Sequence, residues 1–188
     1  MWMPLGWVSA SGAGGATASY ELISTTILGA NTASVSFSLT GAQQAAYKHL
    51  QVRVTARSTS AVSEDNFKLN FNSDTASNYV QHVLYGTGSA VSSNWPGGTQ
   101  TYVQPGSTLG ASATANNFSS HVIDILDAFS TSKNKTLRSF VGFPDSSVYR
   151  VQLYSGLWLS TSAISSLSFA TNANLATGSR FSLYGVRG

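Results

Sequence analysis

Residues 149–188, YRVQLYSGLWLSTSAISSLSFATNANLATGSRFSLYGVRG, decide the fold class of this chain. One face of the first segment carries four aliphatic residues: Val151, Leu153, Leu157 and Leu159. The opposite face carries four polar or aromatic residues: Arg150, Gln152, Tyr154 and Trp158. The alternation returns further along in two apolar pairs: Leu167 with Phe169, and Phe181 with Leu183. Because side chains alternate between faces with a period of two along a β-strand, the stretch predicts three consecutive strands, each with one apolar side.

The same period of two runs through most of the chain upstream. It is clearest in residues 33–39 and 50–56, where apolar residues alternate with Ser, Thr, Gln and Arg. A short helical turn is expected at 41–49, and further strands are expected at 20–28, 67–71, 79–85, 118–126 and 137–143. About ten strands joined by turns, with no helical crossover, predict antiparallel sheets. We therefore expect an all-β fold, an antiparallel β-sandwich that is jelly-roll-like in its wiring.

The chain divides into an extended N-terminal arm, residues 1–18, and a single β-sandwich domain, residues 19–188. Large apolar residues gather at the start of the arm: Trp2, Met3, Leu5, Trp7 and Val8. The flexible run SGAGGATAS follows at 11–19. Two tryptophans ahead of such a tether bury a large apolar area when they dock. We expect Trp2, Met3, Leu5 and Trp7 to anchor the chain on a neighbouring subunit; the alternative is that the arm folds back on its own domain.

Charge is scarce in this chain of 188 residues. Charged residues make up 9% of it, against roughly 25% in typical soluble domains, and Ser, Thr, Asn, Gln and Gly supply the polarity. Such a surface gives weak electrostatic protection against association, so we expect a subunit of a homo-oligomer. The basic residues give a net charge of +3 but are scattered, without interleaved aromatic residues. This distribution argues against nucleic acid binding.

Cysteine chemistry and membrane insertion are not expected either. The chain has no cysteine, which excludes disulfides and thiolate metal sites. The stretch MWMPLGWVSA has no basic residue and no long apolar core, so it does not read as a signal peptide. No segment approaches the roughly 18 apolar residues of a transmembrane helix.

No sequence pattern points to a catalytic or metal site. The three histidines stand in separate strands without the spacing of a metal site: His49, His82 and His121. Asp124 lies within an apolar strand, where it is expected to accept hydrogen bonds from a turn or to pair with Arg138 or Arg150. The chain contains no GxSxG elbow and no phosphate-binding loop. We therefore expect no enzyme, no cofactor and no bound metal.

Residues 86–117 form the longest stretch without a clear period, GTGSAVSSNWPGGTQTYVQPGSTLGASATANN. A stretch of this kind in a compact domain is more often functional or interface-forming than idle. Together with the aromatic face of residues 150–158, it supplies four candidate ligand-binding or interface residues: Trp95, Tyr102, Tyr154 and Trp158. Exposed flat rings bind sugar faces or stack into subunit interfaces, whereas the alternative is burial under this stretch.

Several short motifs together resemble a family of tailed-bacteriophage virion structural proteins, which open with a YELI-type strand and a YKHLQIR-type strand. Here the corresponding motifs are YELI at 20–23, SVSF at 34–37 and YKHLQVR at 47–53. Later matches are NFNSDT at 70–75, SNY at 77–79, VIDILD at 122–127, SGLW at 155–158 and SLYGV at 182–186. The MWMP start is also similar, whereas residues 86–117 match no pattern of that family.

The resemblance implies a jelly-roll-type capsid decoration, head fibre or tail protein, made in the host bacterial cytoplasm and displayed on the exterior of the virion. It implies no activity and supplies no catalytic residue. We therefore expect a non-enzymatic structural protein, a homo-oligomer with a trimer as its expected order, docked on other capsid or tail proteins through its arm. The alternative function is a receptor-binding tail fibre or spike module that recognises host surface glycan through residues 86–117 and the face of Tyr154 and Trp158.

Overall fold

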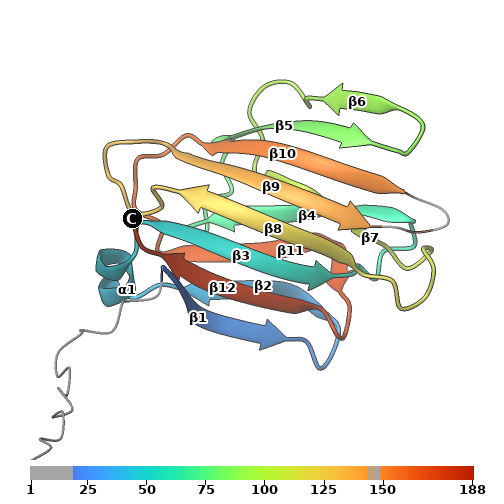
Figure 1. Ribbon diagram of the computed structural model, residues 1–188, viewed down its shortest axis with the longest axis horizontal. Helices are drawn as coiled ribbons and strands as arrows, with labels where there is room; N and C mark the ends of the chain where they lie inside the picture. The colour runs from blue at the N-terminus through green and yellow to red at the C-terminus, as the bar shows by residue number, and fades with distance from the viewer. Residues whose placement is uncertain (1–18, 144, 146–148) are drawn as a thin grey trace, which may run out of the picture.

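The computed structural model describes residues 19–143, 145 and 149–188, and within them the chain folds into two antiparallel sheets (Figure 1). One helix is present among these residues, α1 (Gly41–Ala46). The strands are β1 (Tyr20–Ile27), β2 (Thr32–Ser38), β3 (His49–Ala56), β4 (Glu64–Phe71), β5 (Tyr79–Gly86), β6 (Val91–Asn94), β7 (Val103–Leu109), β8 (Ser119–Leu126), β9 (Lys135–Phe143), β10 (Arg150–Trp158), β11 (Ser166–Leu175) and β12 (Arg180–Val186). The predicted all-β antiparallel sandwich is confirmed, while the predicted arm lies outside the described residues.

The two sheets differ in width. The larger sheet has eight strands in the order β1-β12-β3-β8-β9-β10-β5-β6, and the smaller has four in the order β2-β11-β4-β7. The pairing of β1 with β12 places Tyr20 opposite Val186, so the two ends of the domain meet in one sheet. The three strands predicted in residues 149–188 are present, but β10 and β12 belong to the larger sheet and β11 to the smaller one.

The core lies between the sheets and is rich in aromatic rings. Phe67 of β4 stacks on Phe169 of β11 with ring centroids 5.5 Å apart, and Phe181 of β12 lies 5.6 Å from Phe169. All three side chains are fully buried. Aromatic pairs at this separation stabilise a core beyond the area that they bury. These contacts join the two sheets across the middle of the sandwich.

The inward face of β10 is not the one with the aliphatic residues. Tyr154 and Trp158 are buried, whereas Val151 and Leu153 are 53% and 49% exposed. The ring of Trp158 packs between Phe71 and Tyr79, with centroids 5.5 and 6.4 Å away. A large ring that fills a pocket buries more apolar area than a Val or Leu in the same place, so the aromatic side of the strand faces the core.

Residues 86–117 contain two strands, which corrects the expectation of a long segment without period. β7 is almost wholly buried and forms one edge of the smaller sheet. Its sequence VQPGSTL hides the strand because Pro and Gly are poor strand formers. The pairing of β7 with β4 shifts register between Phe67 and Leu69, and a Cβ on Gly106 would lie 2.7 Å from Nδ1 of His121. A glycine is needed at this close approach.

The predicted helical turn is confirmed as α1. Thr40 caps the helix: its hydroxyl accepts a hydrogen bond from the backbone N–H of Gln43, and the Gln43 side chain accepts one from the backbone N–H of Thr40. This reciprocal capping box satisfies two backbone donors that the first turn would otherwise leave free. The helix lies at the end of the sandwich where the C-terminus emerges (Figure 1).

Candidate functional site

The wider sheet extends past the narrower one at one side of the sandwich. Its strand β10 packs on β7, the edge strand of the smaller sheet, and β5 and β6 continue beyond it. Two glutamines of the overhang cover this edge. The backbone N–H of Gln104 donates to Oε1 of Gln81, and the backbone N–H of Ser107 donates to Oε1 of Gln152 at 3.2 Å. An uncovered strand edge can pair with another chain. Because these side chains occupy the backbone N–H groups of β7, they prevent a further strand from pairing with it.

A polar groove of about 220 Å³ lies where the overhang meets β7. At its mouth the guanidinium of Arg150 forms an ion pair with Glu64, with Nε 3.0 Å from Oε2. The same guanidinium lies over the ring of Tyr85, 4.7 Å from the centroid. The amide of Gln152 donates to Oε1 of Glu64 at 3.2 Å. The groove is lined by Glu64, Asn66, Gln81, His82, Val83, Tyr85, Asn94, Pro96, Gln104, Ser107, Arg150, Gln152 and Tyr154.

Tyr154 closes the inner end of the groove. Its hydroxyl lies 3.4 Å from the Ser107 hydroxyl and accepts a hydrogen bond from the Gln104 amide at 3.4 Å. Burial raises the pKa of Tyr154 above its usual value, and the hydrogen bond with Ser107 offsets only part of this effect. The phenol therefore stays protonated at neutral pH and offers a hydroxyl group, not a base, to anything in the groove.

The four predicted interaction residues do not form one surface. Tyr154 lines the groove, and Trp95 lies between two lining residues, Asn94 and Pro96, with its side chain 56% exposed. Tyr102 is half-buried, with the ammonium of Lys68 5.2 Å from the centre of its ring. Trp158 is buried in the core, so the expected exposed face of Tyr154 and Trp158 is wrong. Trp2, Met3, Leu5 and Trp7 lie outside the described residues.

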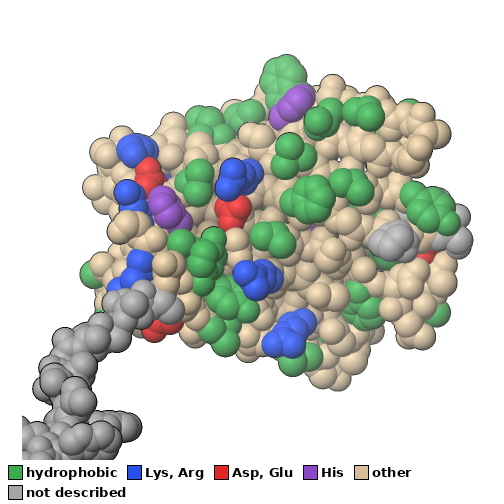
Figure 2. Space-filling model, in the orientation of Figure 1, with side chains coloured by type: hydrophobic (Ala, Val, Ile, Leu, Met, Phe, Trp, Pro, Cys, Tyr) green, Lys and Arg blue, Asp and Glu red, His purple; other side chains and the backbone are tan. Residues whose placement is uncertain are grey.

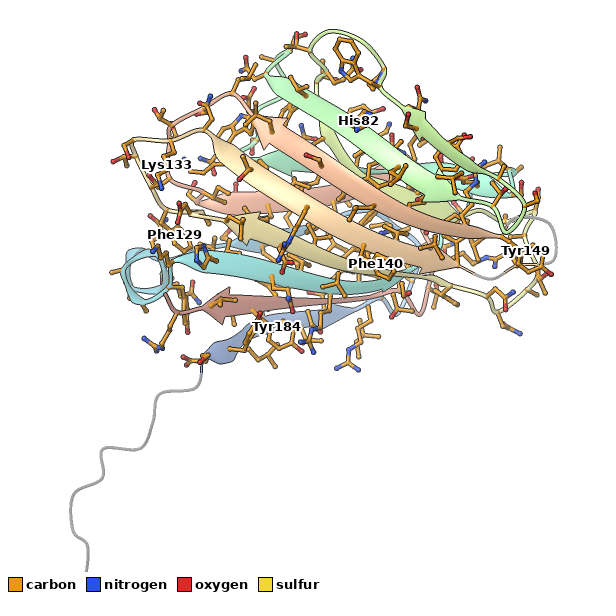
Figure 3. The ribbon with its side chains drawn as sticks, turned by 45° about the horizontal axis from the view of Figure 1, so that its top comes forward. His82, Phe129, Lys133, Phe140, Tyr149 and Tyr184 are labelled. Carbon is orange, nitrogen blue, oxygen red and sulfur yellow. The ribbon has the colours of Figure 1, made fainter. Side chains whose placement is uncertain are left out.

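An apolar row crosses the outer face of the larger sheet, and the sequence reasoning missed it. Its members stand side by side on four adjacent strands: Val122 on β8, Phe140 on β9, Leu153 on β10 and Leu84 on β5. Each of these four side chains is exposed, Phe140 by 58%. Figure 2 shows hydrophobic side chains gathered over this face, and Figure 3 places Phe140 in its middle. We call these four residues the apolar row.

The apolar row continues beside Val151. This residue stands next to Gly142 on one side and Gly86 on the other, so a hollow surrounds its exposed side chain. The signal in the sequence is the presence of apolar residues on both faces of β9 and β10. Strands of this kind are covered on both faces in folded proteins. One face of β9 and β10 is covered by the smaller sheet, and the other faces outward.

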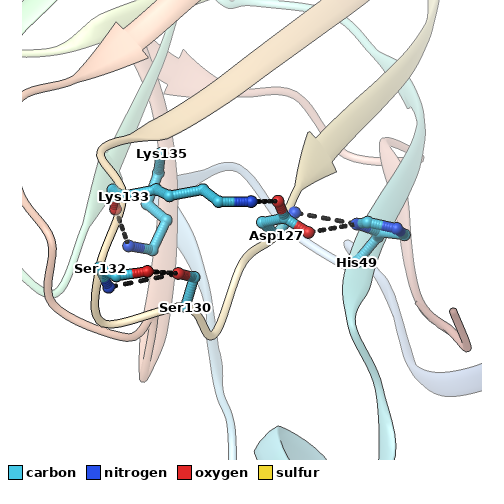
Figure 4. Close-up of polar contacts among 6 residues, drawn as sticks. All are labelled: His49, Asp127, Ser130, Ser132, Lys133 and Lys135. Atoms are coloured by element: carbon cyan, nitrogen blue, oxygen red, sulfur yellow. Dashed lines mark hydrogen bonds and ion pairs between the residues drawn. The ribbon is translucent and has the colours of Figure 1, made fainter.

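A charged cluster lies near α1 (Figure 4). The ammonium of Lys133 lies 2.6 Å from a carboxylate oxygen of Asp127. The hydrogen bond from Lys133, together with its positive charge, is the main cause of the lowered pKa of Asp127. His49 accepts a hydrogen bond at Nδ1 from the backbone N–H of Asp127 at 2.9 Å. In a nucleophilic triad the histidine donates its Nδ1–H to the carboxylate. Nδ1 of His49 is a hydrogen-bond acceptor instead, so His49 and Asp127 are not arranged as in a triad. Nearby, the hydroxyls of Ser130 and Ser132 lie 3.2 Å apart.

The motif residues around Asp74 form a partly buried, hydrogen-bonded corner. The indole N–H of Trp158 donates to Oδ2 of Asp74 at 2.7 Å, and the Asn78 amide donates to the same oxygen at 2.9 Å. These hydrogen bonds, that of Asn78 first, lower the pKa of Asp74. The hydroxyl of Tyr79 donates to the Asp74 carbonyl at 3.0 Å, and the Asn70 amide donates to it at 2.7 Å. Three of the sequence motifs, NFNSDT at 70–75, SNY at 77–79 and SGLW at 155–158, therefore meet around Asp74.

Two further polar candidates, Asp124 and His121, have structural partners. Asp124 pairs with Arg138 at 3.2 Å and accepts from the Gln51 amide at 2.8 Å, which confirms the first of the two predicted arginine partners. His121 is buried, with Nε2 3.0 Å from the Ser119 hydroxyl. Within residues 19–143, 145 and 149–188, no group of three or more His, Cys, Asp or Glu side chains is placed to hold a metal ion.

Comparison with known proteins identifies no relative: the chain matches no protein-family model, no curated protein and no solved structure. In the part of the chain that the structure describes, no helix is both long enough and apolar enough to cross a membrane. The functional interpretation therefore depends on the polar groove, the apolar row and the short motifs.

Proposed function

We propose that this chain is a non-enzymatic structural protein of a tailed-bacteriophage virion, displayed on the particle exterior as a capsid decoration, fibre or tail component. The observation that carries this proposal is the apolar row, which crosses four strands of a domain with little charge. Soluble monomers rarely expose large contiguous apolar patches, and such patches mark assembly sites. The motif resemblance is the reason for proposing that this assembly is a phage particle.

The strand order supports a jelly-roll wiring. Eight strands form two sets of four neighbours, β1-β12-β3-β8 in the larger sheet and β2-β11-β4-β7 in the smaller sheet. Along the chain these strands follow one another in the order β1, β2, β3, β4, β7, β8, β11, β12. We propose on this order that the domain is a jelly roll, an architecture of two Greek keys that is common among viral capsid and lectin domains. The two antiparallel pairs β5-β6 and β9-β10 widen one of the sets. In this proposal the wider sheet is the assembly face.

The occupant that we propose for the apolar row is the N-terminal segment, residues 2–8, of a neighbouring copy. That segment supplies two tryptophans, a methionine and a leucine. It joins the domain at β1, four strand spacings or about 19 Å from β9. Residues 9–19 span at most about 40 Å when extended, which is about twice that separation. If each subunit placed its arm on the next subunit, the subunits would form a closed ring. We propose that this homo-oligomer is a trimer.

Substitution of both Phe140 and Leu153 by serine should dissociate the oligomer. Burial of each large apolar side chain contributes about 1.5–3 kcal/mol, so the double variant should raise the dissociation constant by about 100-fold or more. Light scattering after size exclusion measures the change. Ile27→Ser is the matched control, because Ile27 is 61% exposed but lies on β1, at the opposite edge of the sheet.

Deletion of residues 2–8 should have the same effect as the double substitution if the arm occupies the apolar row. Dissociation by the substitutions but not by the deletion would show that a different segment occupies the row. An unchanged mass for both proteins would remove the apolar row as an assembly site.

Deletion of residues 1–17 should abolish incorporation into phage particles while the domain stays folded. The physical reason is that the arm carries the apolar anchor, whereas the described core lies wholly within residues 19–188. Immunoblotting of purified particles measures occupancy, and thermal unfolding of the purified protein measures the fold. Wild-type occupancy of the truncated protein would contradict docking through the arm.

The polar groove favours a second function for the same protein. Small-ligand sites are hollows in which a few placed polar side chains orient the ligand, and several polar side chains converge in this groove. We propose that the groove recognises host surface glycan, as a receptor-binding fibre or spike module would. Labelled protein should then adsorb to host cells, and Trp95→Ala should reduce that adsorption. Equal adsorption of the variant would argue against this function.

A further inference from the structure

We propose that a glycine-lined hollow beside Val151, on the outer face of the larger sheet, receives the ring of Trp2 or Trp7 from the arm of a neighbouring copy. The proposal rests on the docking of the arm on the apolar row proposed above. It adds a fitted pocket at the end of that row and names the kind of side chain that fills it.

Two glycines stand on either side of Val151 on the outer face. Val151 of β10 pairs with Gly142 of β9 and with Gly86 of β5, and residues directly opposite each other in a sheet share a face. Val151 is 53% exposed, so all three positions face outward. Because the two glycines have no side chains, an open hollow of about 390 Å³ lies over the strands here.

The fold does not require glycine at either position. Neither Gly86 nor Gly142 has a positive φ. A Cβ on Gly142 would lie 3.8 Å from the Ser120 hydroxyl, and one on Gly86 would lie 3.9 Å from the Ala90 carbonyl oxygen, which are ordinary contacts. Glycine weakens a strand and often marks a place where a ligand or another chain approaches closely. Two such glycines on one face therefore indicate that a group from outside the domain packs against them.

The lining of the hollow suits an apolar ring. The guanidinium of Arg150 is already paired with Glu64, and every other lining residue is a glycine, a valine or an aromatic residue. Tyr149 is 58% exposed and stands at this end of the outer face (Figure 3). The volume falls within the roughly 300–1,000 Å³ of pockets that hold small ring compounds. A flat ring can lie on the bare glycine backbone with its edges against Val151 and Tyr149.

The arm is long enough to bring its tryptophans to this hollow. It joins the domain before Tyr20, which stands in the same cross-strand row as Leu157, six residues along β10 from Val151. β1 and β10 are five strand spacings apart, so the hollow of the same subunit lies about 30 Å from the start of β1. Residues 8–19 span at most about 43 Å when extended, which covers that distance.

The hollow of an adjacent copy can lie closer than that of the same subunit. A chain rich in Gly, Ala and Ser, with the length of residues 8–19, has an average end-to-end distance of about 17–21 Å, so docking within one subunit would stretch it. In a ring with the β1 edge of one subunit beside the β6 edge of the next, three strand spacings, or about 14 Å, separate β1 from the neighbour's β10. Docking between subunits therefore needs less extension of the arm.

Gly142→Val in the full-length protein tests the hollow. The new side chain occupies the hollow, its Cβ makes only ordinary contacts, and valine is favoured in strands. The dissociation constant of the oligomer should rise about tenfold or more, as expected for the loss of one buried tryptophan, while circular dichroism shows an unchanged fold. Light scattering after size exclusion over a range of concentrations measures the change.

Two further glycine variants complete the test. Gly86→Val fills the hollow from the other side of Val151 and should have the same effect, so the test does not depend on the folding of one variant. Gly29→Val is the matched control. Gly29 lies in the turn between β1 and β2, where no atom is within 4 Å of a Cβ, and its substitution should leave the oligomer unchanged.

Alanine at the docked tryptophan should weaken the oligomer as much as Gly142→Val. One of Trp2→Ala and Trp7→Ala should do so, and its combination with Gly142→Val should cause no further loss, because both changes remove one contact. Mixing that variant with Gly142→Val should restore a dimer, since the intact arm of one protein can dock in the intact hollow of the other. Absence of this dimer would overturn docking between subunits.

The outcomes separate the hollow from the wider assembly face. An oligomer that withstands both Gly142→Val and Gly86→Val overturns the hollow as the docking site. If that oligomer is still dissociated by the substitutions of Phe140 and Leu153, the proposed assembly face stands and the tryptophans lie elsewhere on it. A monomeric wild-type protein, or an unchanged mass for all of these variants, overturns both.

Discussion

Alanine in place of Trp158 should lower the free energy of unfolding by about 3–5 kcal/mol, as other truncations of a buried tryptophan do. The ring fills the space between Phe71 and Tyr79, and its N–H donates to Asp74 at 2.7 Å. The substitution therefore opens a cavity and removes a hydrogen bond to a carboxylate. Urea unfolding followed by circular dichroism measures the loss.

Two further variants separate the contributions of Trp158. Trp158→Phe keeps one ring in the pocket but loses the indole donor and the volume of the second ring, so it should cost less than the alanine variant, about 1–3 kcal/mol. Trp95→Ala removes an exposed tryptophan and should change stability by less than about 0.5 kcal/mol. If Trp158→Ala were as mild as Trp95→Ala, the assignment of Trp158 to the core would be wrong. Reduced cell adsorption by Trp158→Ala would report unfolding and not a lost sugar contact.

Acid should destabilise the domain through His121. Burial lowers the pKa of this side chain from 6.5 to about 3, because the charged imidazolium cannot be solvated between the sheets. Above pH 6.5 the residue is neutral in both states and has no effect. As the pH falls below 6.5 the unfolded chain takes up a proton that the folded chain refuses. Stability should therefore fall by about 1.4 kcal/mol per pH unit, or about 3 kcal/mol between pH 7 and pH 4.

His121→Gln provides the comparison for the acid effect. Glutamine retains an amide near the Ser119 hydroxyl but does not titrate, so the variant should lose stability at pH 7 and show a flatter profile between pH 6 and pH 4. Asp74 and Asp127, whose pKa values are lowered, are present in both proteins and cancel in the difference. Parallel profiles of unfolding free energy against pH for the two proteins would contradict the role of His121.

Periodicity predicts strands well in this chain but does not decide which side of a strand faces inward when both sides carry apolar residues. In β10 the outcome depends on the opposing sheet. A Cβ on Gly156 would lie 2.4 Å from Cγ2 of Val103, so the glycine leaves room for β7 to approach, and Asp74 receives the indole of Trp158. Neither partner can be inferred from residues 150–158 alone.

The groove could be predicted only in fragments. Its lining residue Tyr154 attracts attention as an aromatic residue in a polar segment, but Glu64 and Arg150 look like ordinary surface charges in the sequence. They meet because one sheet is wider than the other and overhangs β7. By contrast, the pairing of Asp124 with Arg138 follows from simple chemistry, since a carboxylate within an apolar strand needs a cationic partner nearby.

The pairing of β1 with β12 has a consequence for the order of events during synthesis. Among the strands of residues 19–143, 145 and 149–188, β1 is synthesised first, yet the one strand that pairs with it there, β12, is synthesised last, with Tyr20 opposite Val186. The domain therefore cannot reach its native pairing until nearly the whole chain has emerged. Pairing between distant segments also makes folding slow. During this interval the tryptophans of residues 1–18 have emerged while the sandwich domain is still incomplete, so they are exposed before it can fold.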